Sequence, residues 1–421
     1  MKHIINIESR NQITNQVMTE TAQKGIVQLS TQDKVLDGRQ ITVKGKKLIS
    51  FGSCSYLGLE THPALKEASK EAAENYGTQF SSSRAYVSLG LYDKLETLLG
   101  VMFNAPVMVS ASTKLGHLAN IPVLVENHDA VILDEQVHAS VQMAVQLLKA
   151  RNITVEIIRH NRMDILEEKV SSLKENHRKI WYMADGVYSM YGDAAPLKEM
   201  MELVYLYPQL NLYIDDAHGL SWKGLNGSGM AKTVLPRHEQ IFIATSMAKA
   251  FGAGGGIMIY PNDDYRRKVR KCGGTMIFSG PIQPPILGAC IASAEIHLSN
   301  EIYKLQNELE GKINYFIQLA QHLELPLISR NNSPIKFIGV GKPGIGYSMI
   351  RRLMEAGYYA NLSVFPSVSY NHTGIRLPLT NHLTFEDIEG LLYTVAEQLP
   401  LALNEEKFSI RQINRAFKIA V

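Results

Sequence analysis

The sequence predicts an α/β protein with a large, mostly parallel sheet and a smaller carboxy-terminal α+β domain. Short apolar segments near residues 107, 131, 155, 181, 212, 241 and 257 alternate with helical stretches, which is typical of a sheet covered on both faces. The pattern changes near residue 295, where a long amphipathic stretch leads to short strands around 337, 359 and 376. The 421 residues, 45% of them hydrophobic, suffice for a large core and a second domain.

The first 60 residues are expected to form an N-terminal segment of their own. Residues 1 to about 25 are polar and compatible with a helix, and residues 36–49 alternate around Asp-Gly and Lys-Gly turns like a β-hairpin. A helix then runs from Thr61 to about Tyr76, with Pro63 in its first turn and a glycine beyond its end. Residues 61–295 form the large domain in this division.

Residues 296–421 are expected to form the smaller domain and the tail. The amphipathic stretch from Ile296 to about Leu323 predicts one helix, and Thr384 to about Gln398 predicts another. Residues 401–421 carry no motif, although their Arg-Gln-Ile-Asn-Arg run is compatible with a surface helix. The sequence contains no internal repeat and no low-complexity linker.

The composition excludes several classes of protein. With 43 basic and 40 acidic residues, the net charge of +3 gives no case for a nucleic-acid partner, and no dense basic run indicates a membrane surface. No apolar window approaches the length of a membrane span or a signal peptide. Three scattered cysteines, Cys54, Cys272 and Cys290, make neither a disulfide framework nor a zinc site. We therefore expect no metal and a cytoplasmic location.

A single lysine lies between two expected strands in the middle of the chain. Lys249 follows the apolar segment 240–245 and precedes a glycine run and a second apolar segment at 257–260. In one interpretation its ammonium group reaches the surface from an ordinary turn. In the other, Lys249 is desolvated and forms an imine with the aldehyde of pyridoxal phosphate. A lysine alone favours the first interpretation, so other residues must decide.

An acidic and imidazole cluster ends the preceding expected strand. Asp215, Asp216 and His218 follow the apolar segment 211–214, and open α/β sheets place their sites at the carboxyl ends of strands. Asp215 could keep a cofactor's pyridine nitrogen cationic, and His218 could hydrogen-bond its phenolic oxygen. Alternatively, Asp216 and His218 cap the next segment while Asp215 makes a structural ion pair. The motif by itself leaves both alternatives open.

Taken together, the segments Asp215–His218 and Ser246–Gly252 resemble the α-oxoamine synthase family of fold-type I pyridoxal phosphate enzymes. Residues 51–59 are similar to the family's segment ending in Tyr-Leu-Gly-Leu, and residues 185–197 to its Val-Phe-Ser-Met-Asp-Gly-Asp signature. The similarity runs from about Phe51 to Leu399. It implies a fold-type I transferase in which Lys249 anchors the cofactor.

The resemblance implies that Lys249, His138 and Asp215 are catalytic and that His138 stacks on the pyridine ring. On its own, His138 could instead begin a helix, with Ser140 in the turn. Ser189 would lie near the phenolic oxygen or His138, although a loop serine often only satisfies backbone groups.

The resemblance also implies a set of phosphate contacts, because phosphates bind amides and hydroxyls near helix amino termini. The expected groups are the amides of Gly116 and His117 and the hydroxyls of Ser246 and Ser279. This chain has Leu115 where the family usually has serine, and His117 in place of the usual aromatic residue. Ser279 lies in a segment similar to one that reaches the neighbouring subunit, although a glycine- and proline-rich loop is otherwise a plain turn.

On the substrate side, Arg376 interrupts the apolar segment 374–379 and resembles a clamp for an amino acid's carboxylate. Without the family context, it would be interpreted as a strand-edge arginine paired with an acid. Ser55 is the other expected substrate contact, and with Cys54 it stands where relatives often have asparagine or an acid.

The resemblance implies that a homodimer with shared active sites condenses an amino acid with an acyl thioester such as acyl-CoA. Loss of carbon dioxide would then give an α-aminoketone in a biosynthetic reaction. An aminotransferase on the same cofactor is the alternative, since the two reactions diverge after the first deprotonation. A relative that has lost catalysis and serves as a binding module is a third alternative.

Overall fold

The computed structural model describes residues 7–419 and divides the chain into two units. The large unit contains residues 57–189 and 193–307, and the small unit contains the described residues up to Tyr56 together with residues 190–192 and 308–419. The N-terminal helix and hairpin therefore belong to the same unit as the carboxy-terminal part. The sequence suggests three consecutive parts, whereas the structure groups the N-terminal part with the carboxy-terminal one.

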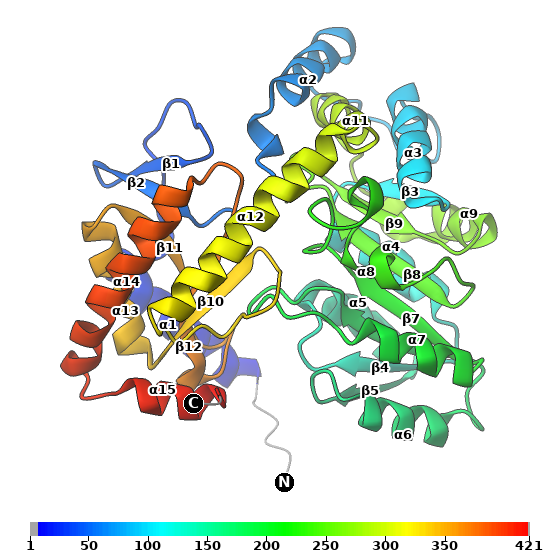
Figure 1. Ribbon diagram of the computed structural model, residues 1–421. Coiled ribbons are helices and arrows are strands. Elements are labelled where there is room, and N and C mark those ends of the chain that lie inside the picture. Colours follow the sequence, from blue (N-terminus) through cyan, green and yellow to red (C-terminus); the bar gives the residue numbers. More distant parts are fainter. Residues whose placement is uncertain (1–6, 420–421) are drawn as a thin grey trace. The chain divides into compact units, whose positions relative to one another are not determined.

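The large unit is built on a seven-stranded sheet in the order β3-β9-β8-β7-β6-β4-β5. The strands are β3 (Val107–Ser110), β4 (Ala130–Asp134), β5 (Thr154–Ile158), β6 (Ile180–Asp185), β7 (Leu210–Asp215), β8 (Ile241–Ser246) and β9 (Gly256–Ile259). Only β9 runs antiparallel to its neighbours in this sheet (Figure 1). The prediction of a mostly parallel sheet is confirmed, and so are the positions of its strands.

Helices cover both faces of this sheet. Alternate residues of β6 enter two different cores, since Tyr182 and Ala184 belong to one apolar cluster and Trp181 and Met183 to the other. The first cluster is completed by α3 (Gly90–Phe103), α6 (Met163–Leu173), α7 (Leu197–Leu206), α8 (Met230–Val234) and α11 (Pro284–His297). The second is completed by α4 (Thr113–Leu124), α5 (Ala139–Lys149), α9 (Asp263–Cys272) and α10 (Gly274–Ile277).

The remaining helices of the large unit are η1 (Leu59–Thr61), α2 (Pro63–Tyr76) and η2 (Leu225–Gly227). The predicted start and end of α2 are confirmed. His62 caps its first turn by accepting a hydrogen bond from the amide of Ala64, and the helix ends at Gly77 with φ of 77°.

The small unit contains a five-stranded mixed sheet in the order β1-β2-β11-β12-β10. Its strands are β1 (Gln40–Val43), β2 (Lys46–Phe51), β10 (Ile335–Gly341), β11 (Tyr358–Ser363) and β12 (Thr373–Pro378). The predicted hairpin is confirmed as β1 and β2. Its turn is formed by Lys44 and Gly45, which both have positive φ.

The small unit's helices are α1 (Ile7–Gln23), most of α12 (Glu301–His322), α13 (Pro343–Glu355), η3 (Tyr370–His372), α14 (Phe385–Glu405) and α15 (Ile410–Phe417). The first six residues of the expected N-terminal helix lie outside the described residues. The helix expected from Ile296 is wrong at its start, because α11 ends at His297 and α12 begins at Glu301. Helix α14 begins at the Thr384 capping box and extends beyond the expected end, and α15 contains the expected surface helix. Within residues 7–419, no helix is long and apolar enough to cross a membrane.

Candidate active site

A cavity of about 250 Å³ lies in the large unit where several parallel strands end. It brings together five residues of the predicted site: His138, Asp215, His218, Ser246 and Lys249. The other lining residues are Ser112, Thr113, Lys114, Ser140, Asp185, Val187 and Ala217. β6 ends at Asp185, β7 at Asp215 and β8 at Ser246, so the sheet places these polar groups at one edge.

Lys249 belongs to the turn between β8 and β9 and is half-buried. The turn is held at both ends, because Ser246 Oγ accepts the amide of Ala248 at 3.2 Å and Lys249 O accepts the amide of Gly252 at 2.9 Å. Gly252 has φ of 77°, and a Cβ there would lie 2.5 Å from Leu59 Cβ. Glycine is therefore required where this turn packs on the backbone before α2.

Asp215 is a buried carboxylate with a strong partner. Its Oδ2 lies 2.9 Å from Nε2 of His117, and its Oδ1 accepts the amide of Ala217 at 3.1 Å. Burial raises the pKa of a carboxyl group, but the charge and hydrogen bond of His117, with Lys249 and His138, lower the pKa of Asp215 to about 2. Asp215 is thus ionised at neutral pH beside the cavity that Lys249 lines.

His138 is at once the residue that precedes α5 and a wall of the cavity. Its Nδ1 lies 2.6 Å from Ser140 Oγ, and its backbone amide donates to Asp185 Oδ1 at 2.9 Å. Burial, followed by the charge of Lys249, holds the pKa of His138 below its usual value. His138 thus both precedes α5 and lines the cavity, so the two interpretations are compatible.

The amino terminus of α4 differs from the predicted phosphate site. Ser112 caps the helix by accepting the amide of Leu115 at 3.2 Å, and the amide of Gly116 donates to Ser112 O at 3.0 Å. The amide of Gly116 is thus used inside the helix, and His117 lies one residue deeper. The first-turn amides of Thr113 and Lys114 have no carbonyl of the helix to reach. These two residues line the cavity, and the capping serine before them is the sequence signal for this helix start.

His117 acts through its side chain rather than its amide. The imidazole is fully buried, and its two nitrogens lie 2.9 Å from Tyr213 OH and 2.9 Å from Asp215 Oδ2. This contact could not be expected from the sequence, because α4 and β7 are distant along the chain.

Ser189 and Ser279 do not line the cavity. Ser189 lies at the end of its segment of the large unit. Ser279 donates to Thr275 O at 2.6 Å and lines a different, much smaller pocket with Arg84 and Tyr92. Ser279 is expected to act in a neighbouring subunit, and that expectation stays a prediction.

Arg376 belongs to the small unit, together with Ser55. It lies on β12, which is an interior strand between β11 and β10, so the strand-edge interpretation is wrong. The guanidinium group is largely buried, and one of its nitrogens lies 3.6 Å from Cys54 Sγ. Cys54, the neighbour of Ser55 in the sequence, thus contacts Arg376, and the roles of Ser55 and Arg376 toward a substrate stay predictions.

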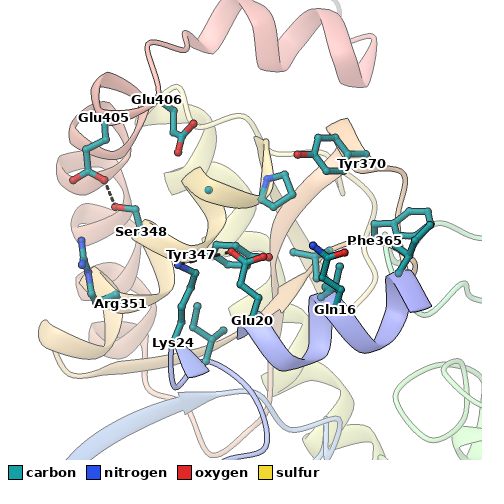
Figure 2. Close-up of a pocket in the computed structure, with 16 residues that line it drawn as sticks. Gln16, Glu20, Lys24, Tyr347, Ser348, Arg351, Phe365, Tyr370, Glu405 and Glu406 are labelled. Atoms are coloured by element: carbon teal, nitrogen blue, oxygen red, sulfur yellow. Dashed lines mark hydrogen bonds and ion pairs between the residues drawn. The ribbon is translucent and has the colours of Figure 1, made fainter. Parts of the chain in front are cut away.

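The small unit also contains a cavity of about 720 Å³ that none of the predicted site residues lines (Figure 2). The ammonium group of Lys24 on α1 lies over the ring of Tyr347 on α13, 5.4 Å from the ring centre, and Glu405 accepts a hydrogen bond from Ser348 at 2.6 Å. The charged residues of its lining are three acidic ones, Glu20, Glu405 and Glu406, and two basic ones, Lys24 and Arg351.

The residues around Lys249 fit pyridoxal phosphate. They supply a primary amine, an ionised buried carboxylate, a helix amino terminus with a neighbouring hydroxyl, and an imidazole, all on one cavity. Within the described residues, no group of three or more His, Cys, Asp or Glu side chains is arranged to hold a metal ion.

Comparisons with known proteins agree with this geometry. The sequence profile of the aminotransferase class I and II family matches residues 46–344. The chain is 28% identical to an 8-amino-7-oxononanoate synthase from Alkaliphilus metalliredigens, over 83% of this chain and 87% of the relative. It is 30% identical to an 8-amino-7-oxononanoate synthase from Symbiobacterium thermophilum, over 84% and 89%.

Among solved structures, a serine palmitoyltransferase from S. paucimobilis superposes with a TM-score of 0.84 at 20% identity, over 99% of this chain and 100% of that one. At this identity the likeness establishes the fold, which is that of a fold-type I transferase. The chain belongs to the aminotransferase class I and II family of pyridoxal phosphate enzymes, and within it to the α-oxoamine synthase acyltransferases.

Proposed function

We propose that the protein condenses an amino acid with an acyl thioester, such as acyl-CoA, and releases carbon dioxide and a free thiol. The observation that carries the proposal is that Lys249 and the ionised carboxylate of Asp215 line the same cavity. The named relatives are synthases, which supports bond formation rather than amino-group exchange. When bound, pyridoxal phosphate supplies an aldehyde for an amine and a cationic ring that withdraws electrons from an amino acid's α-carbon.

The residues of the cavity divide the remaining tasks. Lys249 would be the amine that binds the aldehyde, and its side chain would also take and return the α-proton of the amino acid. Asp215 would hold the proton of the pyridine nitrogen in place, since its carboxylate is ionised at neutral pH. Burial keeps the imidazole of His138 neutral near pH 7, so it can lie flat against the ring without opposing its charge.

The phosphate would be held by the amides of Thr113 and Lys114, the ammonium group of Lys114 and the hydroxyl of Ser246. His218 lies on the same cavity and is the candidate partner of the phenolic oxygen. Arg376 is the candidate clamp for the α-carboxylate, because a buried guanidinium group offers two parallel donors. Ser55 and Cys54, which lie on the segment beside it, would shape this end of the substrate site.

Exposed apolar side chains in the large unit support a homodimer with shared active sites, which the family resemblance implies. Tyr86 and Phe278 are 89% and 86% exposed, and Val87 is also exposed. Ser83 donates to Ile277 O at 2.7 Å, so the two segments that carry these residues are held together, directly before Ser279. We propose that this patch contacts a second copy of the chain in a homodimer.

Transamination is the second candidate, because the family that the sequence profile describes is named for it. The two reactions are separated by giving the cofactor-loaded protein a panel of amino acids with and without acyl-CoA esters. Condensation releases thiol only when both substrates are present. Release of a keto acid without thiol would establish transamination instead.

Replacing Lys249 with alanine is expected to abolish thiol release and the visible absorption band of the loaded protein, because the other lysine that lines the cavity, Lys114, is assigned to the phosphate. Lys232→Ala is a matched control. Lys232 is also partly buried and has a pKa lowered by burial, but it lies on α8 and does not line the cavity. Full turnover in Lys249→Ala would exclude the assignment of this lysine.

A further inference from the structure

His117 occupies a position that the family pattern usually gives to an aromatic residue, and its imidazole makes contacts that a phenyl ring cannot make. Nε2 lies 2.9 Å from Asp215 Oδ2, and Nδ1 lies 2.9 Å from Tyr213 OH. All three side chains are buried. The protonation states open to a buried imidazole with both nitrogens engaged depend on what those partners can donate and accept.

The same heavy-atom positions satisfy two protonation states of His117. As an imidazolium ion it donates to Asp215 and to the oxygen of Tyr213, and the Tyr213 hydroxyl proton turns to Met258 Sδ at 3.9 Å. As a neutral imidazole with its proton on Nε2, it still donates to Asp215, and Tyr213 OH donates to Nδ1. Only a rotation of one hydroxyl group separates the two states.

The charge on this side of the cavity differs before and after the cofactor is bound. Without it, the Asp215 carboxylate is buried and needs a cation close by. With it, the carboxylate faces a protonated pyridine nitrogen, and an imidazolium on its other side would place two cations on one anion. The titratable groups that surround the pair are Tyr213 on β7, Asp216 directly after β7, Asp185 on β6, Tyr260 on β9, His138 at the start of α5, Lys114 on α4 and Lys249 after β8.

We propose that His117 is a positioning residue that neutralises Asp215 as an imidazolium ion in the unloaded protein and becomes a neutral imidazole when Asp215 pairs with the cofactor's pyridine nitrogen. The proton leaves Nδ1 for solvent, and the hydrogen bond from Nε2 to Asp215 persists throughout. Asp215 therefore keeps its ionisation and its orientation in both states. The proposal rests on the cofactor assignment made above.

Nitrogen-15 NMR of histidine-labelled protein tests the proposal on the unaltered chain. In the unloaded protein at neutral pH, both ring nitrogens of His117 are expected to carry a proton. After loading with pyridoxal phosphate, Nδ1 is expected to lose its proton while Nε2 keeps its own. An identical protonation state before and after loading would overturn the proposal. Absence of the visible absorption band on loading would be a failure of the cofactor assignment instead.

The variant His117→Gln shows which nitrogen-15 signals belong to His117, because they disappear from its spectrum. It also allows a second measurement, the pH dependence of the affinity for pyridoxal phosphate. Glutamine can still donate to Asp215 but cannot change its charge. The affinity of the unaltered protein for pyridoxal phosphate should therefore rise more steeply with pH than that of His117→Gln, by up to about tenfold per pH unit, because one more proton is released. Titrations of other groups are common to both proteins and cancel in the comparison. Equal slopes would contradict the release of a proton from His117.

Discussion

Asp215 and Asp216 are adjacent residues at the end of β7, and both side chains are buried, but their carboxyl groups are in opposite states. The pKa of Asp215 is lowered to about 2, whereas burial raises the pKa of Asp216 to about 8. The backbone alternates at the end of a strand, so the two side chains enter different surroundings. Asp215 lines the cavity and contacts His117, while Asp216 does not line it.

The surroundings of Asp216 are made of backbone and glycine. Its Oδ2 accepts the amide of Ala231 at 2.9 Å, and its Oδ1 is buried with no hydrogen-bond partner. A Cβ added at Gly186 or Gly219 would lie 2.2 Å or 2.0 Å from Oδ1, and one at Gly229 would lie 2.4 Å from Oδ2. Three glycines thus admit the side chain without supplying a cation. Both carboxyl groups are buried, so the partner, and not burial, decides which of them is ionised.

The largest expected difference between the two residues is in the pH dependence of stability. The pKa of Asp216 is raised from 3.8 to about 8, so its stabilising contribution is full below the unfolded value and is lost as pH rises through the folded value. Asp216→Asn stays neutral at every pH. Between about pH 5 and pH 8, the unfolding free energy of the unaltered protein should fall relative to Asp216→Asn by up to about 1.4 kcal/mol per pH unit.

Urea titrations at a series of pH values measure this difference, and Asp33→Asn in the small unit is the control. Hydrogen bonds from Thr31 and Thr42 lower the pKa of Asp33 to about 2, so its contribution is present above pH 3.8 and lost as pH falls through about 2. Its removal should therefore change stability by a constant amount between about pH 5 and pH 8. Parallel curves for the unaltered protein and Asp216→Asn would show that Asp216 is ionised.

The next effect concerns the cofactor. Asp215→Asn removes the negative charge that the pyridine nitrogen requires, and a hydrogen bond to a charged group contributes about 1.5–3 kcal/mol, so the affinity for pyridoxal phosphate should fall about 10- to 100-fold. Asp216→Asn replaces a neutral carboxyl group by a neutral amide, and its affinity should change by less than about threefold. Absorbance titration of both variants gives the two constants. Similar losses in both would mean that the two carboxyl groups share one role.

Much of this fold follows from sequence periodicity, because the strands of the large unit are short and mainly apolar, and five of the seven end at a polar residue. The positions of Lys249 and Asp215 in the site follow for the same reason, since both lie at the ends of such runs. The contact between His117 and Asp215 could not be predicted, because it joins α4 to β7 through packing. The assignment of the hairpin to the small unit depends in the same way on the pairing of β2 with β11.

The raised pKa of Asp216 could not be predicted from the sequence either. The motif treats the two aspartates alike, and the glycines that enclose the second come from three separate segments. The expectation that Asp216 caps the next segment holds only for its bond to Ala231, at the start of α8.

The smallest expected effect comes from adding a methyl group to one of the three glycines that surround the carboxyl group of Asp216. Gly219→Ala adds a methyl group 2.0 Å from Asp216 Oδ1, and Gly219 does not have positive φ, so the cost comes from the close contact rather than from the backbone. Overpacking of this kind costs about 1–3 kcal/mol of unfolding free energy. In Gly90→Ala the new methyl group meets nothing within 4 Å, and the change should stay within about 0.5 kcal/mol. If Asp216→Asn and Gly219→Ala are combined, the amide group of Asn meets the same methyl group, so the loss of unfolding free energy should persist. A smaller loss in the double variant would mean that the charge of Asp216, and not its size, causes the destabilisation.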